Sequence, residues 1–356
     1  MPKGKDIGAV DFFCGAGGLT CGLLKARVKN AGISVVAGID SDEKCRFPYE
    51  ENNKGAKFIH KKIEDVRAGE VGKLVGGFKW KVFVGCAPCQ PFSSYTLKAR
   101  KSVKNTGNWN LIEYFMKNIK AVKPDVVSME NVPQLIKQEI FSRFVKKLEK
   151  AGYSPSYSVV NCARHGMPQS RRRLVLLASR HGEINFPAPS KKTKTLYNTI
   201  GKMPELENGK EDAGDSLHVC AKLGETNLKR ILASSPGGTW EDWDEELLPE
   251  CYKKASGQTY KNVYGRMSWN EPAPTITGQF YRYGTGRFGH PEQSRALSLR
   301  EGALIQTFPK KYKFFPNREK FSRVSIGMQI GNAVPVKLGK LIGNTIIQHI
   351  QEISHG

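Results

Sequence analysis

Two cysteines stand three positions apart in "VGCAPCQPFSSY" (84–95), a pattern that could serve as a redox pair, half of a zinc site, or a nucleophile with a neighbouring thiol. Zinc is disfavoured because no second cysteine pair and no nearby histidine stands at ligand spacing. A redox pair usually opens a helix, whereas Pro88, Pro91 and the apolar run before them indicate a loop leaving a strand. Open α/β sheets keep their active sites at the carboxyl ends of strands. We therefore predict that Cys89 is a nucleophile and Cys86 a bystander.

A glycine-rich turn follows the first apolar run in "DFFCGAGGLT", where Gly15, Gly17 and Gly18 leave bare backbone that can approach a ligand. Asp40 ends the next apolar run, and a carboxylate at that position can accept hydrogen bonds from ribose hydroxyl groups. Together these residues fit a nucleotide-like cofactor. A purely structural turn stays open as the alternative, because Thr20 stands where the GxGxxG pattern of dinucleotide-binding folds has its third glycine.

Strand-like and helix-like patterns alternate through the first half of the chain and must position these groups. Short apolar runs predict buried strands at 6–13, 34–40, 57–63, 81–87, 125–132 and 173–179. Amphipathic spacing predicts helices at 19–32, 110–122 and 140–152. Strands that alternate with helices form a parallel sheet covered on both faces. The predicted fold class is therefore α/β, with a doubly wound, mostly parallel sheet.

The sequence changes character after Ser179, where proline, glycine and charged residues replace the alternation. A final helical pattern at 336–353 is apolar enough to pack back onto the first part of the chain. We therefore predict a large domain formed by residues 1–185 and 301–356, with a small domain at 186–300 as an excursion from it.

Lysine and arginine outnumber aspartate and glutamate by 56 to 33, which gives a formal net charge of +23. Basic residues concentrate in three clusters, at 97–104, 163–173 and 310–323. This clustering favours nucleic acid as a partner over the alternative of solvated surface lysines. The N-terminal residues lack the apolar segment of a secretory signal, and no apolar run reaches the roughly 18 residues of a membrane span. We expect a soluble, intracellular protein with free thiols.

Seven sequence blocks follow one another along the chain: "DFFCGAGG" (11–18), "GCAPCQPFS" (85–93), "MENV" (129–132), "QSRRRLVLLA" (169–178), "GRMSWNEPAPTIT" (265–277), "GRFGHPEQSRALSLREGALIQTFP" (286–309) and "QIGNAVP" (329–335). In content and order they resemble DNA (cytosine-5) methyltransferases of the bacterial restriction-modification type. The resemblance implies a Rossmann-like methyltransferase domain with a smaller target-recognition domain. It also implies methyl transfer from S-adenosylmethionine, leaving S-adenosylhomocysteine, to carbon 5 of a flipped cytosine within a short specific duplex sequence, through a covalent cysteine adduct.

The catalytic residues implied by this resemblance are Cys89, Glu130, Arg171 and Arg173. Cys89 supplies the thiolate that adds to carbon 6 of the ring. Glu130 engages ring nitrogen 3 and the exocyclic amine, the alternative being a carboxylate that merely closes a strand. Arg173 contacts the flipped base and Arg171 stabilises the region of the cysteine, the alternative being a phosphate clamp. Arg172, between them, is expected to point the other way on a strand.

Cofactor contacts are also implied by the resemblance. They are Phe13, Gly15, Gly17, Gly18, Asp40, Ile63, Pro88, Leu111, Asn332 and Val334. The chain departs from the family at two of the positions involved: Asp40 is a glutamate in many relatives, and Lys62 stands where many have an aspartate for the adenine amino group. The residue that contacts adenine is therefore left open. Asp42 could contact the adenosine or cap the helix that follows.

The residues implied to contact DNA are Ser93, Lys101, Lys104, Arg282 and Arg287. The first three belong to a polar, lysine-rich segment, 93–108, which is predicted to close over the flipped cytosine; the alternative is a solvated loop without a catalytic role. The two arginines are candidates for guanine contacts, although arginine serves phosphate at least as often.

The partners implied are double-stranded DNA and a cognate restriction endonuclease that acts on the same site. We expect a monomer without a metal ion or membrane contact, cytoplasmic and nucleoid-associated, of bacterial, archaeal or phage origin. Two alternatives are methylation of RNA by the same chemistry and a non-enzymatic nucleic-acid binder, which the presence of Cys89, Glu130 and Arg173 disfavours. A nicotinamide dehydrogenase is rejected because of the altered glycine spacing. The recognition sequence cannot be read from the chain.

Overall fold

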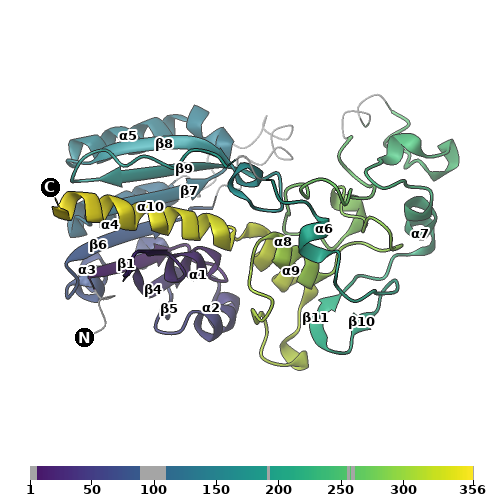
Figure 1. Cartoon of the computed structure of the whole chain (residues 1–356), viewed down its shortest axis with the longest axis horizontal. Helices are drawn as coiled ribbons and strands as arrows, with labels where there is room; N and C mark the ends of the chain where they lie inside the picture. The colour runs from purple at the N-terminus through teal and green to yellow at the C-terminus, as the bar shows by residue number, and fades with distance from the viewer. Residues whose placement is uncertain (1–5, 89–109, 191–192, 255–256, 258–260, 356) are drawn as a thin grey trace. The chain divides into compact units, whose positions relative to one another are not determined.

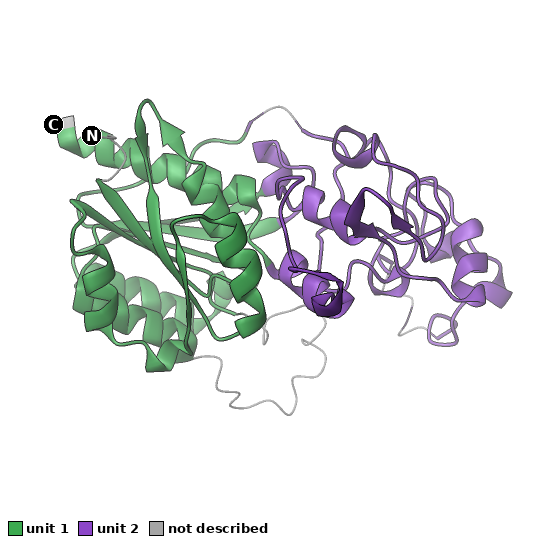
Figure 2. Ribbon diagram, turned by 90° about the horizontal axis from the view of Figure 1, so that it is seen from below, with its two compact units in different colours: residues 1–161, 172–189, 333–356 green, residues 162–171, 190–332 purple. Residues whose placement is uncertain are grey.

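Two compact units make up the computed structural model, which describes residues 6–88, 110–190, 193–254, 257 and 261–355. Unit 1 comprises residues 1–161, 172–189 and 333–356, and unit 2 comprises residues 162–171 and 190–332 (Figure 2). Both ends of the chain therefore belong to unit 1, and unit 2 is an excursion from it.

The boundaries of the units differ from the predicted ones at three segments, one of which is 186–189, predicted in the small domain but part of unit 1. Residues 162–171 and 301–332 were predicted within the large domain, and both pack within unit 2. The side-chain amide of Gln169 gives the physical reason, because it donates to the carbonyl of Ile305 at 3.2 Å and to the side-chain oxygen of Gln306 at 2.6 Å. Hydrogen bonds between segments so far apart in sequence leave no local pattern.

Unit 1 is built around a seven-stranded sheet with the order β5-β4-β1-β6-β7-β9-β8 (Figure 1). The strands are β1 (Ile7–Phe12), β4 (Ser34–Asp40), β5 (Lys57–His60), β6 (Trp80–Gly85), β7 (Val126–Asn131), β8 (Ser154–Asn161) and β9 (Arg172–Ser179). From β5 to β7 all neighbours run parallel, and β9 runs antiparallel to β7 and β8. The predicted doubly wound, mostly parallel sheet is confirmed, with all six predicted strands in it.

The strand that the sequence did not predict is β8, at one edge of the sheet. Its segment "SPSYSVVN" is rich in serine and contains Pro155, which has no N–H to donate to a ladder. Proline is tolerated on an edge strand. Only Val160 of β8 is buried, so the segment lacks the continuous apolar run that marks the central strands.

Helices cover both faces of this sheet (Figure 1). They are α1 (Gly18–Leu24), α2 (Arg46–Asn52), α3 (Ala68–Val75), α4 (Asn110–Val122), α5 (Glu139–Lys150) and α10 (Val336–His355). Helices α3, α4 and α5 pack side by side over a core that includes Val10 and Phe12 of β1. Because side chains alternate along a strand, Asp11 faces the other side, where α1 and α10 pack together. The predicted return of a C-terminal helix to the first part of the chain is confirmed.

Glycines allow α1 and α10 to approach closely. A Cβ atom on Gly22 would lie 2.4 Å from the carbonyl oxygen of Val336, and one on Gly339 would lie 2.8 Å from that of Leu19. A larger residue at either position would separate the helices. The C-terminal helix therefore holds α1, the helix that follows the glycine turn.

The predicted helix at 19–32 is wrong beyond its first half. Helix α1 ends at Leu24, and a small antiparallel hairpin follows, formed by β2 (Arg27–Val28) and β3 (Ala31–Gly32). Lys29 has a φ of 50°, in the left-handed region, and this turns the chain between the two strands.

Unit 2 has short elements joined by long irregular segments. Its described helices and strands are α6 (Tyr197–Ile200), β10 (Glu211–Asp212), β11 (Asp215–Val219), α7 (Glu225–Leu232), α8 (Leu299–Ile305) and α9 (Arg323–Asn332). Part of its core is aromatic and includes Trp240, Trp243 and Tyr283. The buried guanidinium of Arg266 donates to four main-chain carbonyl groups at 2.7 to 3.1 Å. Arg266 thereby supplies hydrogen-bond donors to main-chain carbonyl groups, which must find a partner when they are buried.

A buried ion pair fixes the start of α8. Arg295 donates two hydrogen bonds of 2.8 Å to the carboxylate of Glu301, which also accepts from the N–H of Ser298 at 2.7 Å. The Ser298 hydroxyl accepts in return from the N–H of Glu301, which completes a capping box. Burial by itself would raise the pKa of Glu301, but the charge and hydrogen bonds of Arg295 lower that pKa to about 2. The pair is therefore ionised at neutral pH.

Candidate active site

The carboxyl ends of the parallel strands bring several predicted site residues to one edge of the sheet. Phe13 follows β1, Asp40 closes β4, and Cys86 follows β6. Glu130 lies near the end of β7, while β9 runs in the opposite direction and so begins at this edge, where it carries Arg173. Ligands of open α/β sheets bind at such an edge.

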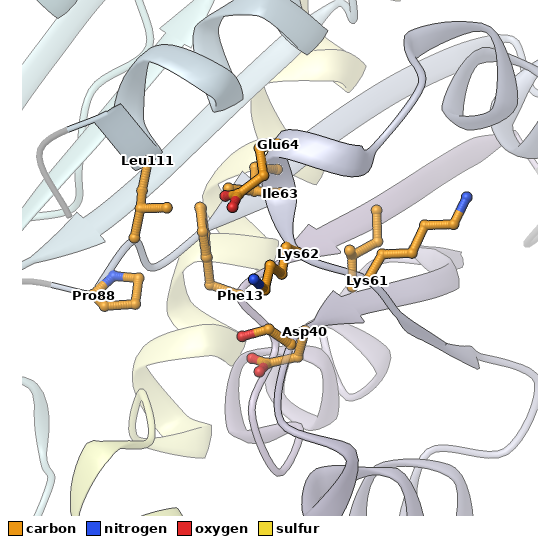
Figure 3. A pocket seen from close by; sticks show the side chains of 10 residues that line it. Phe13, Asp40, Lys61, Lys62, Ile63, Glu64, Pro88 and Leu111 are labelled. Carbon is orange, nitrogen blue, oxygen red and sulfur yellow. The ribbon is translucent and has the colours of Figure 1, made fainter. Parts of the chain in front are cut away.

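A cavity of about 340 Å³ opens there in unit 1 (Figure 3). It is lined by Phe13, Ile39, Asp40, Ser41, Lys61, Lys62, Ile63, Glu64, Pro88 and Leu111. Five of the residues predicted for cofactor binding are among them, namely Phe13, Asp40, Ile63, Pro88 and Leu111. Leu111 and Pro88 lie on one side of the cavity and Asp40 at another (Figure 3). Apolar walls beside a carboxylate suit a ligand that has both apolar and hydroxyl-bearing parts.

Main-chain donors hold the carboxylate of Asp40 at the cavity wall. Its Oδ2 accepts from the N–H of Gly15 at 2.8 Å, and its Oδ1 accepts from that of Asp42 at 2.9 Å. Burial raises the pKa of Asp40, and these hydrogen bonds oppose the rise. Each carboxylate oxygen can accept a further hydrogen bond, so the fixed side chain can bind hydroxyl groups of a ligand.

Left-handed residues shape the turn between β1 and α1. The φ angles are 59° at Phe13, 51° at Gly15 and 87° at Gly17. A left-handed residue with a bulky side chain is strained, and such strain is concentrated at functional sites. In this turn, the left-handed backbone lets the N–H of Gly15 donate to Asp40 and places the Phe13 side chain in the cavity wall.

Not all of the predicted cofactor residues reach the cavity. Gly15, Gly17 and Gly18 shape the turn but are not among the residues that line it. Asn332 ends α9 in unit 2, and Val334 is buried in unit 1; neither lines the cavity.

Sequence reasoning missed Ile39, Ser41, Lys61 and Glu64, and it gave Lys62 no role. Lys61 and Glu64 follow β5, another parallel strand whose carboxyl end lies at this edge, and that position was the available signal. The ammonium of Lys61 pairs with Glu70 at 2.7 Å and points away from the other labelled side chains (Figure 3).

Asp42, for which two roles were open, caps the short turn that follows it. Its Oδ1 accepts from the N–H of Lys44 at 3.1 Å, and it is not among the cavity residues. The capping alternative is the one that the described contacts support.

A second group of side chains surrounds Glu130, whose carboxylate is 3% exposed. The thiol of Cys86 donates to Oε2 at 2.9 Å, and Nε of Arg173 lies 3.0 Å from Oε1 in an ion pair. Asn131, the next residue of β7, donates its side-chain amide to the carbonyl of Ala87 at 3.0 Å. Two side-chain hydrogen bonds therefore tie the segment before Pro88 to β7.

The arginines of "QSRRR" have separate environments. Arg173 pairs with Glu130, while Arg172 is exposed. Arg171 belongs to unit 2, where its buried guanidinium donates to the carbonyl groups of Ile276 at 2.8 Å and Gly331 at 3.1 Å. These contacts link Arg171 to two later sequence blocks of the same unit.

Asp11 is a fully buried carboxyl group beneath the glycine turn, and sequence reasoning gave it no role. Its Oδ2 accepts from the hydroxyl of Thr20 at 2.7 Å, and that hydroxyl lies 3.0 Å from the hydroxyl of Tyr49. Within the described part of the chain, Oδ1 has no hydrogen-bond partner. Burial raises the pKa of Asp11 to about 7, against a lowering contribution from Thr20 and a raising one from Asp40.

We predict that Asp11→Asn removes a pH dependence of stability. The folded state keeps the proton of Asp11 up to a pKa of about 7, whereas an unfolded chain releases it near 3.8. The free energy of unfolding should therefore fall as pH rises between these values, by at most a few kcal/mol, roughly 1.4 kcal/mol for each unit of pKa difference. Urea denaturation of both proteins at about pH 5 and about pH 8 measures this change. An exposed substitution, Asp244→Asn, is the control, and an equal slope in Asp11→Asn and wild type would contradict the prediction.

The predicted DNA contacts are only partly within the described residues. Arg282 is exposed, with its guanidinium 5.8 Å from the centre of the Tyr281 ring. Arg287 is half-buried and donates to the carbonyl of Gly237 at 3.1 Å. Four predicted site residues lie outside the described residues: Cys89, Ser93, Lys101 and Lys104.

The described residues contain neither a metal-binding cluster nor a membrane-spanning helix. No group of three or more histidine, cysteine, aspartate or glutamate side chains placed to hold a metal ion occurs in that part of the chain. Among the same residues, no helix has the length and apolar character needed to cross a membrane.

Comparisons with known proteins agree with one another. A family model described as C-5 cytosine-specific DNA methylase matches residues 7–348. The chain is 47% identical over 353 residues to the type II methylase M.HgiDII of Herpetosiphon aurantiacus, with 97% of this chain and 96% of that protein covered. It is 31% identical to the type II methyltransferase M.PspPI of Psychrobacter sp. (strain TA137), with 97% and 80% covered. The solved structure of the methyltransferase EhMeth of Entamoeba histolytica shares the fold, with a TM-score of 0.67, 14% identity and coverage of 97% and 99%.

Proposed function

The chain belongs to the C-5 cytosine-specific DNA methylase family, and we propose that it transfers a methyl group from S-adenosylmethionine to carbon 5 of a cytosine flipped out of a short specific duplex sequence. Its family membership makes it a DNA (cytosine-5)-methyltransferase of the type II restriction-modification kind. The finer proposal is carried by one observation: the buried Glu130, held between Cys86 and Arg173, lies at the same strand ends as a nucleotide-sized cavity.

The cavity fits S-adenosylmethionine, which supplies an electrophilic methyl group when bound. In the proposal, Asp40 binds the ribose hydroxyl groups, since its carboxylate is fixed by two main-chain donors and can accept further hydrogen bonds. Phe13, Ile63 and Leu111 provide apolar walls, and Pro88, which precedes Cys89 in the sequence, provides another. The contacts proposed in addition are those of Gly15, Gly17, Gly18, Asn332 and Val334.

Carbon 5 of cytosine is a poor nucleophile, and the proposed chemistry activates it covalently. The thiolate of Cys89 adds to carbon 6, which makes carbon 5 nucleophilic. Glu130 accepts from the exocyclic amine, and a proton held between its carboxyl group and ring nitrogen 3 offsets the negative charge that develops on the ring as the thiolate adds. Arg173 orients Glu130 and contacts the base, and Arg171 supports the region of Cys89.

Unit 2 is proposed to recognise the target sequence on double-stranded DNA. Removing a base from the stack costs a few kcal/mol, which the contacts with protein must offset. The formal charge of +23 favours binding to the phosphate backbone, through Ser93, Lys101 and Lys104 in the proposal. The exposed Arg282 is the freer of the two predicted groove contacts, because Arg287 already donates to the main chain. We propose a monomer that protects DNA from a cognate restriction endonuclease.

Bisulfite sequencing of DNA from cells that express the chain tests this proposal and gives the target sequence. We expect methylated cytosine at one short motif throughout the DNA, compared with none at that motif in cells that carry the empty vector. Methylation confined to RNA, or no methylation of any nucleic acid by the purified, folded protein with S-adenosylmethionine, would overturn it.

A further inference from the structure

We propose that Cys86 is a positioning residue that fixes the carboxylate of Glu130 and decides which of its two oxygens meets the cytosine. This inference rests on the proposed function, because it concerns the same site. The sequence had indicated that Cys86 is a bystander of Cys89. The contact of 2.9 Å between its sulfur and Oε2 of Glu130 is the observation that assigns it a role.

The pairing of neighbouring strands holds the backbones of the two residues close together. Cys86 directly follows β6, and its N–H donates to the carbonyl of Phe12 at 3.2 Å. Strands β6 and β7 pair with Gly85 opposite Met129, so the next residue on each strand is Cys86 and Glu130. The position of the sulfur is thus set by the parallel sheet itself.

The two oxygens of Glu130 have different surroundings. Oε2 accepts the hydrogen bond from the thiol of Cys86. Oε1 lies 3.0 Å from Nε of Arg173, yet among the described residues it accepts no hydrogen bond of good geometry. Oε1 therefore has more acceptor capacity left for an N–H group of the base than Oε2, which already accepts one hydrogen bond.

A thiol is suited to this task because it is an uncharged donor. A carboxylate held only by an ion pair can rotate about its last bond, and both oxygens would then compete for Arg173. The S–H bond to Oε2 opposes that rotation without adding a second positive charge beside Glu130.

The experiment measures methyl transfer to target duplex at saturating DNA and S-adenosylmethionine for wild type, Cys86→Ala and Cys86→Ser. Alanine removes the donor, and we expect the rate constant to fall by about 10- to 100-fold, the scale of a hydrogen bond to a charged group. Serine keeps a donor and should restore a large part of this loss. Because the loss lies in the chemical step, KM for DNA and the affinity for S-adenosylhomocysteine should change little. Cys251→Ala, which removes an exposed thiol of unit 2, is the matched control.

Repeating the alanine substitution in a Glu130→Gln background identifies the route of the effect. With the charged acceptor gone, Cys86→Ala should cost little more. Three results would each overturn the role of Cys86: an equal loss of rate in both backgrounds, an alanine variant as fast as wild type, or a loss confined to KM or cofactor affinity. In any of these cases, methyl transfer to DNA by the wild-type protein would still support the proposed function. Wild-type protein that transfers no methyl group to DNA would overturn both.

Discussion

Cys89→Ser is expected to reduce methyl transfer by about ten-thousandfold or more, the scale seen when a covalent enzyme loses its nucleophile. A serine hydroxyl is a far weaker nucleophile than a thiolate at neutral pH, so carbon 6 is not attacked and carbon 5 stays unreactive. Binding should persist, because the cavity is lined by other residues, such as Asp40 and Leu111. The measurement is single-turnover transfer of labelled methyl to target duplex, alongside titration of S-adenosylhomocysteine.

A duplex with 5-fluorocytosine at the target position distinguishes the two neighbouring thiols. After transfer, carbon 5 carries the methyl group and fluorine, which cannot leave as a cation, so the sulfur stays bonded to carbon 6. We expect an adduct that survives denaturing electrophoresis, requires S-adenosylmethionine, and is absent in Cys89→Ser. Cys251→Ser should form it as wild type does. Peptide mapping of the adduct to Cys86 would show that the nucleophile was misassigned.

Arg295→Met should destabilise the folded protein by about 3–5 kcal/mol, because it leaves the carboxylate of Glu301 buried without its partner. The loss is large since two hydrogen bonds of 2.8 Å disappear together and neither group reaches water. Without Arg295, burial should raise the pKa of Glu301 above its ordinary value of 4.5, so the variant should lose stability as pH rises through the new pKa, whereas this group makes wild type lose stability as pH falls from 4.5 to about 2. Urea denaturation, followed by the fluorescence of the buried Trp240 and Trp243, measures the change.

Two further variants test whether the buried charge is the cause. Arg295→Met combined with Glu301→Gln removes both charges and keeps a side chain for the capping box, so it should be more stable than Arg295→Met alone. Glu225→Ala breaks an exposed ion pair with Lys229 and should leave the free energy of unfolding within error. A double variant no better than Arg295→Met would indicate that packing, and not charge, sets the loss.

The central sheet could be predicted from the sequence because its strands are buried on both faces and appear as apolar runs, as "IGAVDF" does in β1. The edge strand β8 could not, since half-exposed serines and Pro155 leave no such run. The structure of most of unit 2 also could not be predicted from the sequence. Its order depends on side chains such as Arg266, which pairs carbonyl groups of two separate segments, at 231–234 and 290–293, and such contacts leave no local periodicity.

Some residues of the candidate site could likewise be predicted from the sequence, and others could not. Asp40 and Glu130 could be predicted because each ends a recognisable strand and belongs to a motif. The role of Cys86 could not, because it depends on a carboxylate 44 positions later in the chain that only the pairing of β6 with β7 brings near. Glu64 lies beside a predicted residue, yet its place in the cavity wall depends on where β5 ends.

The packing of α1 against α10 has a consequence for biosynthesis. The N–H of Arg27, just after α1, bonds to the side chain of Asn344 at 2.9 Å across 317 positions of sequence. On the ribosome, α1 emerges well before its partner helix α10, and residues 190–332 of unit 2 emerge between them as one continuous stretch. Helix α10 can therefore pack onto α1 only after translation has passed unit 2, although every residue that lines the cavity lies between Phe13 and Leu111 and has emerged long before.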